Sequence, residues 1–222
     1  YRYLQVVLFF MTKVAAVVPV YLKTPENDEK LSLLQTKKIL GKYPIILVCP
    51  ESLDVSEYQF LTDKTERFAD KNFKGVKAYS RLCLDVKFYE RFKEYDYIFI
   101  CQPDGWVFRD ELEEWCEKGY DYVGAPWFEG FDGADENSKM LTEVGNGGMS
   151  LRKVKSHIEL FKNPCVIHSY TDLAEENKKK KLISNILNIP FNLIRFFVQF
   201  AVPTRFLTKL NEDFYIAKYG KK

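Results

Sequence analysis

Acidic side chains that could act on a bound substrate occur at two places in the sequence. Asp104 follows the apolar run Tyr95–Cys101 by three residues and precedes a glycine, so its carboxylate can be exposed on a tight turn. Glu212 and Asp213 form an adjacent acidic pair. A carboxylate beyond a strand can bind a divalent ion on a diphosphate, and one in a cleft can act as a general base. The alternatives are a plain turn and a helix start.

Two further segments could contact a ligand. Gly147 and Gly148 follow Asn146, and residues without a Cβ let the backbone approach a flat or bulky ligand closely. Tyr79 could stack on a base, and Arg81 could bind a phosphate. The alternatives are a glycine turn, a packed ring and a surface charge, so local sequence alone does not decide.

The hydrophobic pattern predicts the elements that must position these side chains. Short apolar runs predict four buried strands, at Val14–Val20, Tyr43–Cys49, Tyr95–Cys101 and Tyr120–Gly124. Helical spacing predicts helices at Glu26–Leu40, Tyr79–Phe92 and Arg109–Lys118, and a further helix that begins at Ser150. Strands that alternate with helices predict a single α/β domain with a mostly parallel, mixed central sheet flanked by helices.

In a sheet of this kind, ligands bind beyond the carboxyl ends of the strands. The segments that follow the predicted strands are therefore candidate site segments: Pro19–Tyr21, Pro50–Glu51, Gln102–Asp104 and Gly124–Trp127.

Composition limits the classes of protein that fit. The 222 residues are enough for one large domain with its own core, and 46% hydrophobic and 29% charged residues exclude a disordered chain. The net charge of +2 argues against a dedicated polyanion binder. Five scattered cysteines without a Cys-x-x-Cys pair favour a reducing compartment over a disulfide framework, and with two histidines they make a zinc site improbable.

The C-terminal part differs from the rest. Lys178–Lys222 contains ten basic and two acidic residues, and its Leu182–Thr204 segment carries a single charge. Polar residues recur there every three or four positions: Asn185, Asn188, Asn192, Arg195 and Gln199. A helix with such a stripe beside Lys178–Lys181 is typical of a segment that lies on an anionic membrane surface. The alternatives are a helix that covers the core of the protein itself or that packs against another subunit.

The order of the motifs along the chain resembles a GT-A-fold glycosyltransferase. The motifs are VVPVY at 17–21, YSRL at 79–82, QPD at 102–104, GAPW at 124–127, GNGGMSLR at 145–152 and NED at 211–213. The greatest likeness is to an uncharacterised bacterial and fungal glycosyltransferase-like domain family, with a more distant likeness to the β-1,4-galactosyltransferases. The resemblance runs from about Val14 to Tyr215 and is weakest over Pro164–Thr208.

The resemblance implies roles for residues that match the family motifs. Residues expected to hold the nucleoside diphosphate are Pro19, Tyr21, Tyr79, Arg81, Gln102 and Asp104. Residues expected around the sugar and the acceptor are Trp127, Asn146, Gly147 and Gly148. Asp104 matches the last acid of a metal-binding DxD motif whose first acid is replaced by Gln102, which implies a weak single-carboxylate site for Mn²⁺ or Mg²⁺. Asp213, preceded by Glu212, matches the catalytic base of inverting members.

We therefore expect a glycosyltransferase that moves a sugar from a nucleotide sugar, a UDP-sugar by preference, to a glycan or lipid-linked acceptor in polysaccharide biosynthesis. The expected location is cytoplasmic and peripheral to the inner membrane face through 178–204, with no nucleic-acid partner. The expected parts are an added or disordered segment at 1–10, a nucleotide-sugar-binding core at 11–177, a basic amphipathic helical insertion at 178–210 and the end of the catalytic domain at 211–222. The rival hypotheses are a nucleotidyltransferase and a non-catalytic sugar- or partner-binding module.

Overall fold

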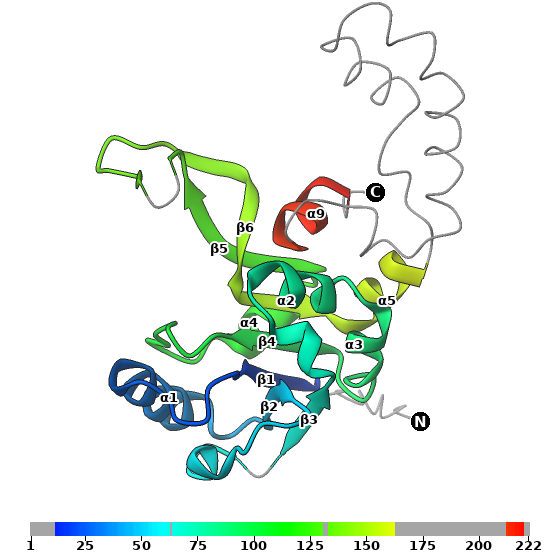
Figure 1. Cartoon of the computed structure of the whole chain (residues 1–222). Coiled ribbons are helices and arrows are strands. Elements are labelled where there is room, and N and C mark those ends of the chain that lie inside the picture. Colours follow the sequence, from blue (N-terminus) through cyan, green and yellow to red (C-terminus); the bar gives the residue numbers. More distant parts are fainter. Residues whose placement is uncertain (1–11, 63, 131–132, 163–211, 220–222) are drawn as a thin grey trace, which may run out of the picture.

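A six-stranded sheet forms the centre of the computed structural model, which describes residues 12–62, 64–130, 133–162 and 212–219 (Figure 1). In spatial order the strands are β3 (Thr65–Phe68), β2 (Ile45–Pro50), β1 (Val14–Pro19), β4 (Tyr97–Cys101), β6 (Met140–Lys153) and β5 (Tyr122–Phe128). The pairs β3–β2, β2–β1 and β1–β4 are parallel, whereas β6 is antiparallel to both neighbours. The predicted α/β class with a mostly parallel, mixed sheet is confirmed.

The helices connect the strands and cover the sheet. They are α1 (Asn27–Leu40), α2 (Val76–Cys83), α3 (Val86–Glu90), α4 (Leu112–Glu117), α5 (Val154–Lys162) and α9 (Glu212–Tyr219), with short 3₁₀ turns η1 (Ser56–Tyr58) and η2 (Asp70–Phe73). The predicted helix at Glu26–Leu40 corresponds to α1. Here the Glu29 side chain accepts a hydrogen bond of 3.0 Å from the backbone N–H of Glu26, which satisfies one free donor of the first turn.

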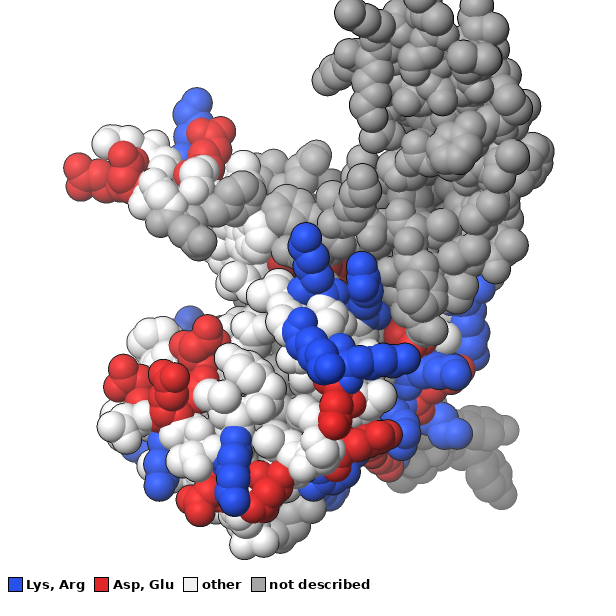
Figure 2. All heavy atoms as spheres, in the orientation of Figure 1, with Lys and Arg blue, Asp and Glu red and all other residues white. Residues whose placement is uncertain are grey.

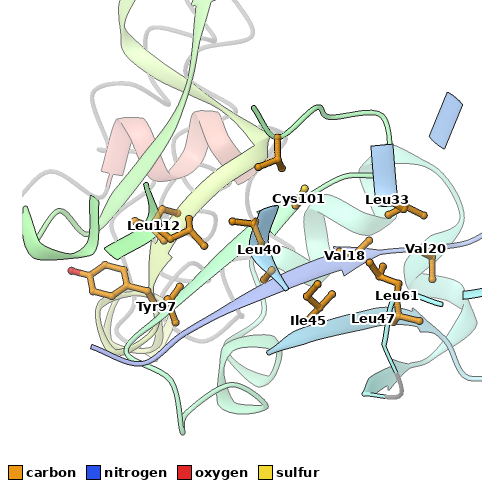
Figure 3. Packing of buried hydrophobic residues seen from close by; sticks show 14 of the residues in the cluster. Val18, Val20, Leu33, Leu40, Ile45, Leu47, Leu61, Tyr97, Cys101 and Leu112 are labelled. Atoms are coloured by element: carbon orange, nitrogen blue, oxygen red, sulfur yellow. The ribbon is translucent and has the colours of Figure 1, made fainter. Parts of the chain in front are cut away.

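Two apolar layers lie on opposite faces of the sheet because the central strands are buried on both sides. Along β1, alternate residues point into different clusters: Val14, Ala16 and Val18 into one, Ala15 and Val17 into the other. The first cluster includes side chains of α1 and α4 (Figure 3). The second includes side chains of α2, α3, α5 and α9, so the helix that carries Glu212 and Asp213 packs on the same side as α2.

Three boundary predictions were wrong for identifiable reasons. The expected single helix at Tyr79–Phe92 is two helices, α2 and α3, because Asp85 caps the second by accepting a hydrogen bond from the N–H of Lys87. The expected helix start at Ser150 is strand, since β6 continues to Lys153 and α5 begins only at Val154.

The third wrong boundary concerns the last predicted strand. β5 begins at Tyr122 and continues to Phe128, so the GAPW segment lies inside a strand rather than beyond its end. β3 and β6 were not among the four predicted strands. Residues 1–10 and 178–210, which include the predicted membrane-binding segment, lie outside the described residues. Among the helices of the described ranges, none combines the length and apolar character needed to cross a membrane.

Neighbouring leucines on α1 provide a direct test of the first apolar layer. Leu33 is 1% exposed and belongs to the first cluster, whereas the side chain of Leu34 is 46% exposed. We expect Leu33→Ala to lower the free energy of unfolding by about 2–5 kcal/mol, because it removes buried methyl groups and leaves a cavity. The matched control Leu34→Ala should change it by less than about 0.5 kcal/mol. Urea denaturation of both variants measures the difference, and equal losses would contradict the assigned burial.

Candidate active site

An irregularity in β6 creates the backbone shape of the site. Asn146 is paired with Ala125 and Ser150 with Gly124, so residues 147–149 have no counterparts on β5 and form a bulge. On the other side, Met149 remains paired with Cys101, the last residue of β4. The bulge therefore lies at the carboxyl end of β4, where a sheet of this topology places ligands.

A fully buried arginine holds the bulge together. Arg152 is 0% exposed, and its Nη2 donates to the carbonyl oxygen of Gly147 at 3.1 Å. Its Nε donates to the Ser150 hydroxyl at 2.9 Å and its Nη1 to the Tyr89 hydroxyl at 3.0 Å. Ser150 in turn donates to the same Gly147 carbonyl at 2.8 Å. Five donors on a rigid plane allow one side chain to join a strand, a bulge and helix α3.

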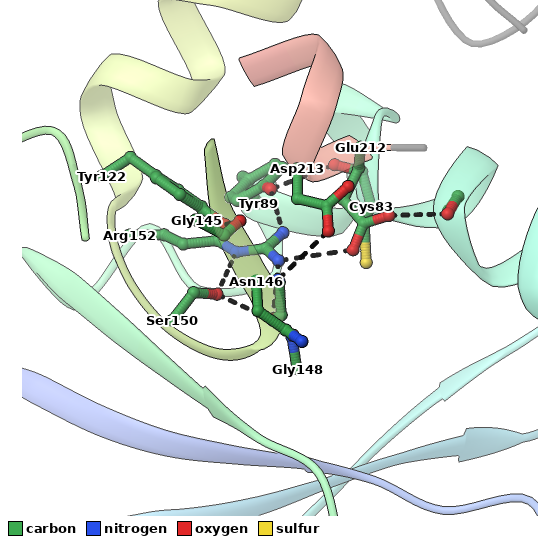
Figure 4. Close-up of polar contacts among 12 residues, drawn as sticks. Cys83, Tyr89, Tyr122, Gly145, Asn146, Gly148, Ser150, Arg152, Glu212 and Asp213 are labelled. Carbon is green, nitrogen blue, oxygen red and sulfur yellow. Dashed lines mark hydrogen bonds and ion pairs between the residues drawn. The ribbon is translucent and has the colours of Figure 1, made fainter. Parts of the chain in front are cut away.

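The first turn of α9 brings two acids to this arginine (Figure 4). Glu212 is 7% exposed; its Oε1 lies 3.5 Å from Nη2 of Arg152, and its Oε2 accepts a hydrogen bond of 2.6 Å from the Ser80 hydroxyl. Asp213 is 6% exposed, and its Oδ2 accepts a bond of 3.3 Å from the backbone N–H of Gly147. Carboxylates at a helix N-terminus are also favoured by the helix dipole.

Gly147 is required by this arrangement. A Cβ at position 147 would lie 2.7 Å from Oε1 of Glu212 and 3.1 Å from Nη2 of Arg152. Any side chain there would force the ion pair apart. The glycine therefore allows the bulge and α9 to pack closely within the protein, and its own N–H donates to Asp213.

Burial keeps the neutral groups around Arg152 neutral. It raises the pKa of the Cys83 thiol to about 12, an effect to which the charge of Glu212 adds, and it raises the pKa of Tyr122 to about 12. It also raises the pKa of Tyr89, although the arginine opposes this shift. Among the described residues, the charges of this cluster are thus those of Arg152 and the acids on α9.

The loop after β4 adjoins the bulge. The backbone N–H of Gln102 donates to the Gly148 carbonyl at 2.9 Å, and the Gln102 side chain occupies the space that a Cβ on Gly148 would need. The Gly148 N–H donates to Oδ1 of Asn146 at 2.7 Å. Asp104 is exposed two residues further on.

The far side of this loop is fixed to α1. The Ser32 hydroxyl donates to the carbonyl of Gly105, and Nε2 of Gln35 donates to the carbonyl of Val107 at 3.0 Å. Figure 2 shows the surface indented below the projecting β5–β6 hairpin, above the part of the molecule that carries α1.

Of the residues predicted to form the site, direct contacts join six: Gln102, Asn146, Gly147, Gly148, Glu212 and Asp213. The other six lie on neighbouring segments: Pro19, Tyr21, Tyr79, Arg81, Asp104 and Trp127. Pro19 is buried at the end of β1 and Tyr21 is 60% exposed just beyond it. Arg81 is exposed on α2, and Trp127 is partly buried within β5.

Tyr79 resembles a core residue more than a free stacking platform. Its ring packs against Phe73 at 6.4 Å, and its hydroxyl is buried. Burial raises the pKa of this hydroxyl, with further contributions from the neighbouring Cys83 and from Glu212. The hydroxyl therefore lies within electrostatic reach of Cys83 and Glu212.

Sequence reasoning missed the partners that hold the acids: Ser80, Tyr89, Ser150 and Arg152. The available signal was the alternation of two polar residues, Ser150 and Arg152, with the apolar residues Met149 and Leu151. In a strand, residues two apart lie on one face, so this alternation indicates a polar face that needs a partner.

The described residues contain no group of three or more His, Cys, Asp or Glu side chains suited to a metal ion. Asp104 is a single exposed carboxylate two residues after Gln102, whose side chain is an amide. This donor set fits an ion that takes most of its ligands from a diphosphate and water, as Mg²⁺ does.

The ion pair between Arg152 and Glu212 can be tested by removing one partner or both. We expect Arg152→Met to lower the free energy of unfolding by about 3–5 kcal/mol, because it leaves Glu212 buried without its counter-charge. Adding Glu212→Gln to this variant should restore part of the loss, since no uncompensated charge then remains. Chemical denaturation of the single and double variants measures the coupling.

The control for this cycle is an exposed pair of the same chemistry. Arg109 and Glu111 lie 2.6 Å apart with the arginine side chain 79% exposed, and Arg109→Met should cost less than about 1 kcal/mol. Equal losses for the two arginine variants would refute the buried-charge argument.

His157 predicts a pH dependence of stability. It is 2% exposed, its Nδ1 bonds to the Lys153 carbonyl at 2.8 Å, and its ring stacks on Tyr89 at 4.8 Å. Burial, with the charge of Arg152, lowers the pKa of His157 to about 3. Below the unfolded value of 6.5, the unfolded chain binds one more proton than the folded chain at this residue, so stability falls with falling pH by up to about 1.4 kcal/mol per unit.

The measurement compares wild type with His157→Gln between pH 7 and pH 4 by urea denaturation. The variant should lose this part of the slope while keeping the contribution of its carboxylates. Parallel curves for the two proteins would show that His157 does not titrate as assigned.

The comparisons with known proteins give a family and a partial likeness to solved structures. A crystal structure of S. aureus TarS, residues 1–349, matches with a TM-score of 0.40 and 12% identity over 65% of this chain and 48% of that one. The chain thus spans about half the length of that protein fragment, and the likeness carries no functional assignment. No curated protein matches. A family model described as "Protein of unknown function (DUF5672)" matches residues 62–219, which is well over half of the chain, and the chain therefore belongs to the DUF5672 family.

Proposed function

We propose that this protein is a glycosyltransferase that moves a sugar from a nucleotide sugar, by preference a UDP-sugar, to a glycan or lipid-linked acceptor with inversion of the anomeric carbon. Two kinds of support meet here. The ordered motifs resemble the GT-A glycosyltransferases, and the mixed sheet with β6 reversed is compatible with a GT-A-like fold.

The observation that carries the proposal is the convergence of three distant segments at the end of β4. Gln102 bonds to Gly148, and Gly147, next in the bulge, bonds to Asp213. A loop that ends in an exposed acid and a helix that begins with buried acids thus share one backbone bulge. A transferase needs this combination, because the leaving diphosphate and the attacking hydroxyl must be held on opposite sides of one sugar carbon.

The contacts of Glu212 favour Asp213 as the base. Glu212 accepts a hydrogen bond from Ser80 and forms an ion pair with Arg152, so it serves to neutralise the buried arginine. Asp213 lies next to it, where its Oδ2 accepts a bond of 3.3 Å from the Gly147 N–H in the bulge. In the proposed reaction, Asp213 takes the proton of the acceptor hydroxyl while that oxygen attacks the anomeric carbon and the nucleoside diphosphate leaves.

The donor would lie along the carboxyl ends of β1 and β4. Asp104 would hold a Mn²⁺ or Mg²⁺ ion on the diphosphate, and that ion would neutralise the charge that develops on the leaving phosphates. Arg81 would add a second cation, and Pro19 and Tyr21 would contact the nucleoside. Asn146, Gly148 and Trp127 would border the sugar and the acceptor.

The test is sugar transfer or UDP release measured with a panel of UDP-sugars and Mn²⁺. Asp213→Asn should lower the turnover number by about 10²–10⁴-fold, because it removes a general base without changing the size of the side chain. Asp104→Asn should abolish the metal dependence of UDP binding. Asp135→Asn, at an exposed position of the β5–β6 hairpin, is the control and should leave activity unchanged.

The alternative is a non-catalytic binding module, a hypothesis favoured by the replacement of the first motif acid by Gln102. Calorimetry with UDP and Mn²⁺ separates the two. Tight metal-dependent UDP binding supports the transferase. Sugar binding that is independent of metal and unaffected by Asp104→Asn would support the module instead.

A further inference from the structure

Four cations lie close together on the outer face of η2 and α2. Lys71 belongs to η2, Lys74 follows it, and Lys77 and Arg81 lie on α2, where all four side chains are exposed. We call the three lysines and Val76 the η2–α2 surface; Arg81, beside them on α2, belongs to the proposed donor site. In Figure 2, basic side chains gather on the face that carries α2 in Figure 1.

These cations have no ion-pair partner within the part of the chain that the structure describes. The nearby Asp70 instead accepts a bond of 3.0 Å from the backbone N–H of Ser52. Hydrogen bonding with Ser52 lowers the pKa of Asp70, and the charge of Lys74 has a weaker influence in the same direction. Elsewhere, exposed lysines do pair with acids: Lys23 with Asp54, Lys118 with Glu114, and Lys155 with Glu159. The η2–α2 surface therefore presents uncompensated positive charge.

The positions of the cations oppose the stability of α2. Its first turn contains no acid, whereas Lys74 and Lys77 place positive charge at the end of the helix that is already positive. Lys77 and Arg81 are four residues apart, so they repel each other on one helical face. The helix dipole and the spacing of the charges therefore do not account for these cations, which are available to an external anion.

An apolar side chain lies among the cations. Val76 is 71% exposed at the first position of α2, directly after Gly75, whose φ of 85° turns the backbone there. The rings nearby, Phe73 and Tyr79, pack on each other and are only partly exposed. Single-stranded nucleic acid usually requires exposed aromatic rings for stacking, whereas a protruding aliphatic group among lysines suits the boundary between headgroups and acyl chains.

We propose that the η2–α2 surface docks on an anionic lipid bilayer, with the lysines at the headgroups and Val76 at the acyl boundary. The surface adjoins the candidate active site, since Ser80, next to Arg81, bonds to Glu212. A lipid-linked acceptor held in the same bilayer would therefore be presented close to Asp213. This inference concerns described residues alone and does not depend on the segment 178–204 or on catalysis.

Co-sedimentation of the full chain with vesicles of phosphatidylcholine containing 30% phosphatidylglycerol tests the proposal. Each cation close to an anionic bilayer contributes about fivefold to binding. The triple variant Lys71→Gln, Lys74→Gln and Lys77→Gln should therefore bind about 100-fold more weakly than wild type. Arg81 is left unchanged because it belongs to the proposed donor site. Binding of wild type should also weaken as salt rises and screens the charges.

The matched control removes the same charge from cations that are already paired: Lys23→Gln, Lys118→Gln and Lys155→Gln. This variant should bind nearly as wild type does. Equal losses in both triple variants would overturn the proposal, as would wild-type binding to neutral vesicles at the same strength. Binding to soluble polyphosphate with no binding to the anionic vesicles would overturn the lipid assignment.

A stability measurement confirms that the variants fold and tests the argument itself. Lys77→Glu removes the repulsion with Arg81 and places an acid at the start of α2. Its midpoint of thermal unfolding should rise by about 2 °C while its vesicle binding falls. A fall in the midpoint would show that the lysine stabilises the fold and would remove the basis of the inference.

Discussion

The structure of the site depends on one electrostatic constraint, the neutralisation of a buried guanidinium. Arg152 has no access to water, and a charge in that position is tolerated only when it is paired and its donors are bonded. The strand and α3 supply oxygen acceptors, but the negative charge comes from Glu212, 60 residues later in the chain. The start of α9 is therefore fixed against β6 by a requirement of charge, in addition to the apolar packing of Tyr215 and Ile216.

This constraint also explains the shape of the backbone next to it. The glutamate can reach Arg152 only because position 147 has no side chain, and the bulge at 147–149 turns the Gly147 N–H toward Asp213. Structural and chemical roles are thus divided between adjacent acids. Glu212 neutralises Arg152, and Asp213, which accepts a hydrogen bond from the Gly147 N–H, lies at the end of β4.

Local pattern was sufficient for the central strands and for α1, since β1, β2 and β4 are buried on both faces and read as continuous apolar runs. It failed for β6, where Gly145, Gly147 and Gly148 suppress strand propensity and the polar pair Ser150 and Arg152 obscures the core pattern. Gly147, Gly148 and the acids at 212 and 213 were recognised as candidate site residues, but the buried Arg152 that joins them was not. An ion pair across 60 residues leaves no local signature, because its partner is specified only by the folded topology.

The exposed cations of the η2–α2 surface present the opposite case to Arg152. A buried charge without compensation would prevent folding, so its partner must lie within the chain. Exposed charges are solvated, and repulsion between them costs only tenths of a kcal/mol, on the order of the values for helix pairs. Such a cost can persist without an internal partner. The positions of Lys71, Lys74 and Lys77 can therefore suit an external anionic surface at little cost to folding. The position of Arg152 is determined by the fold itself.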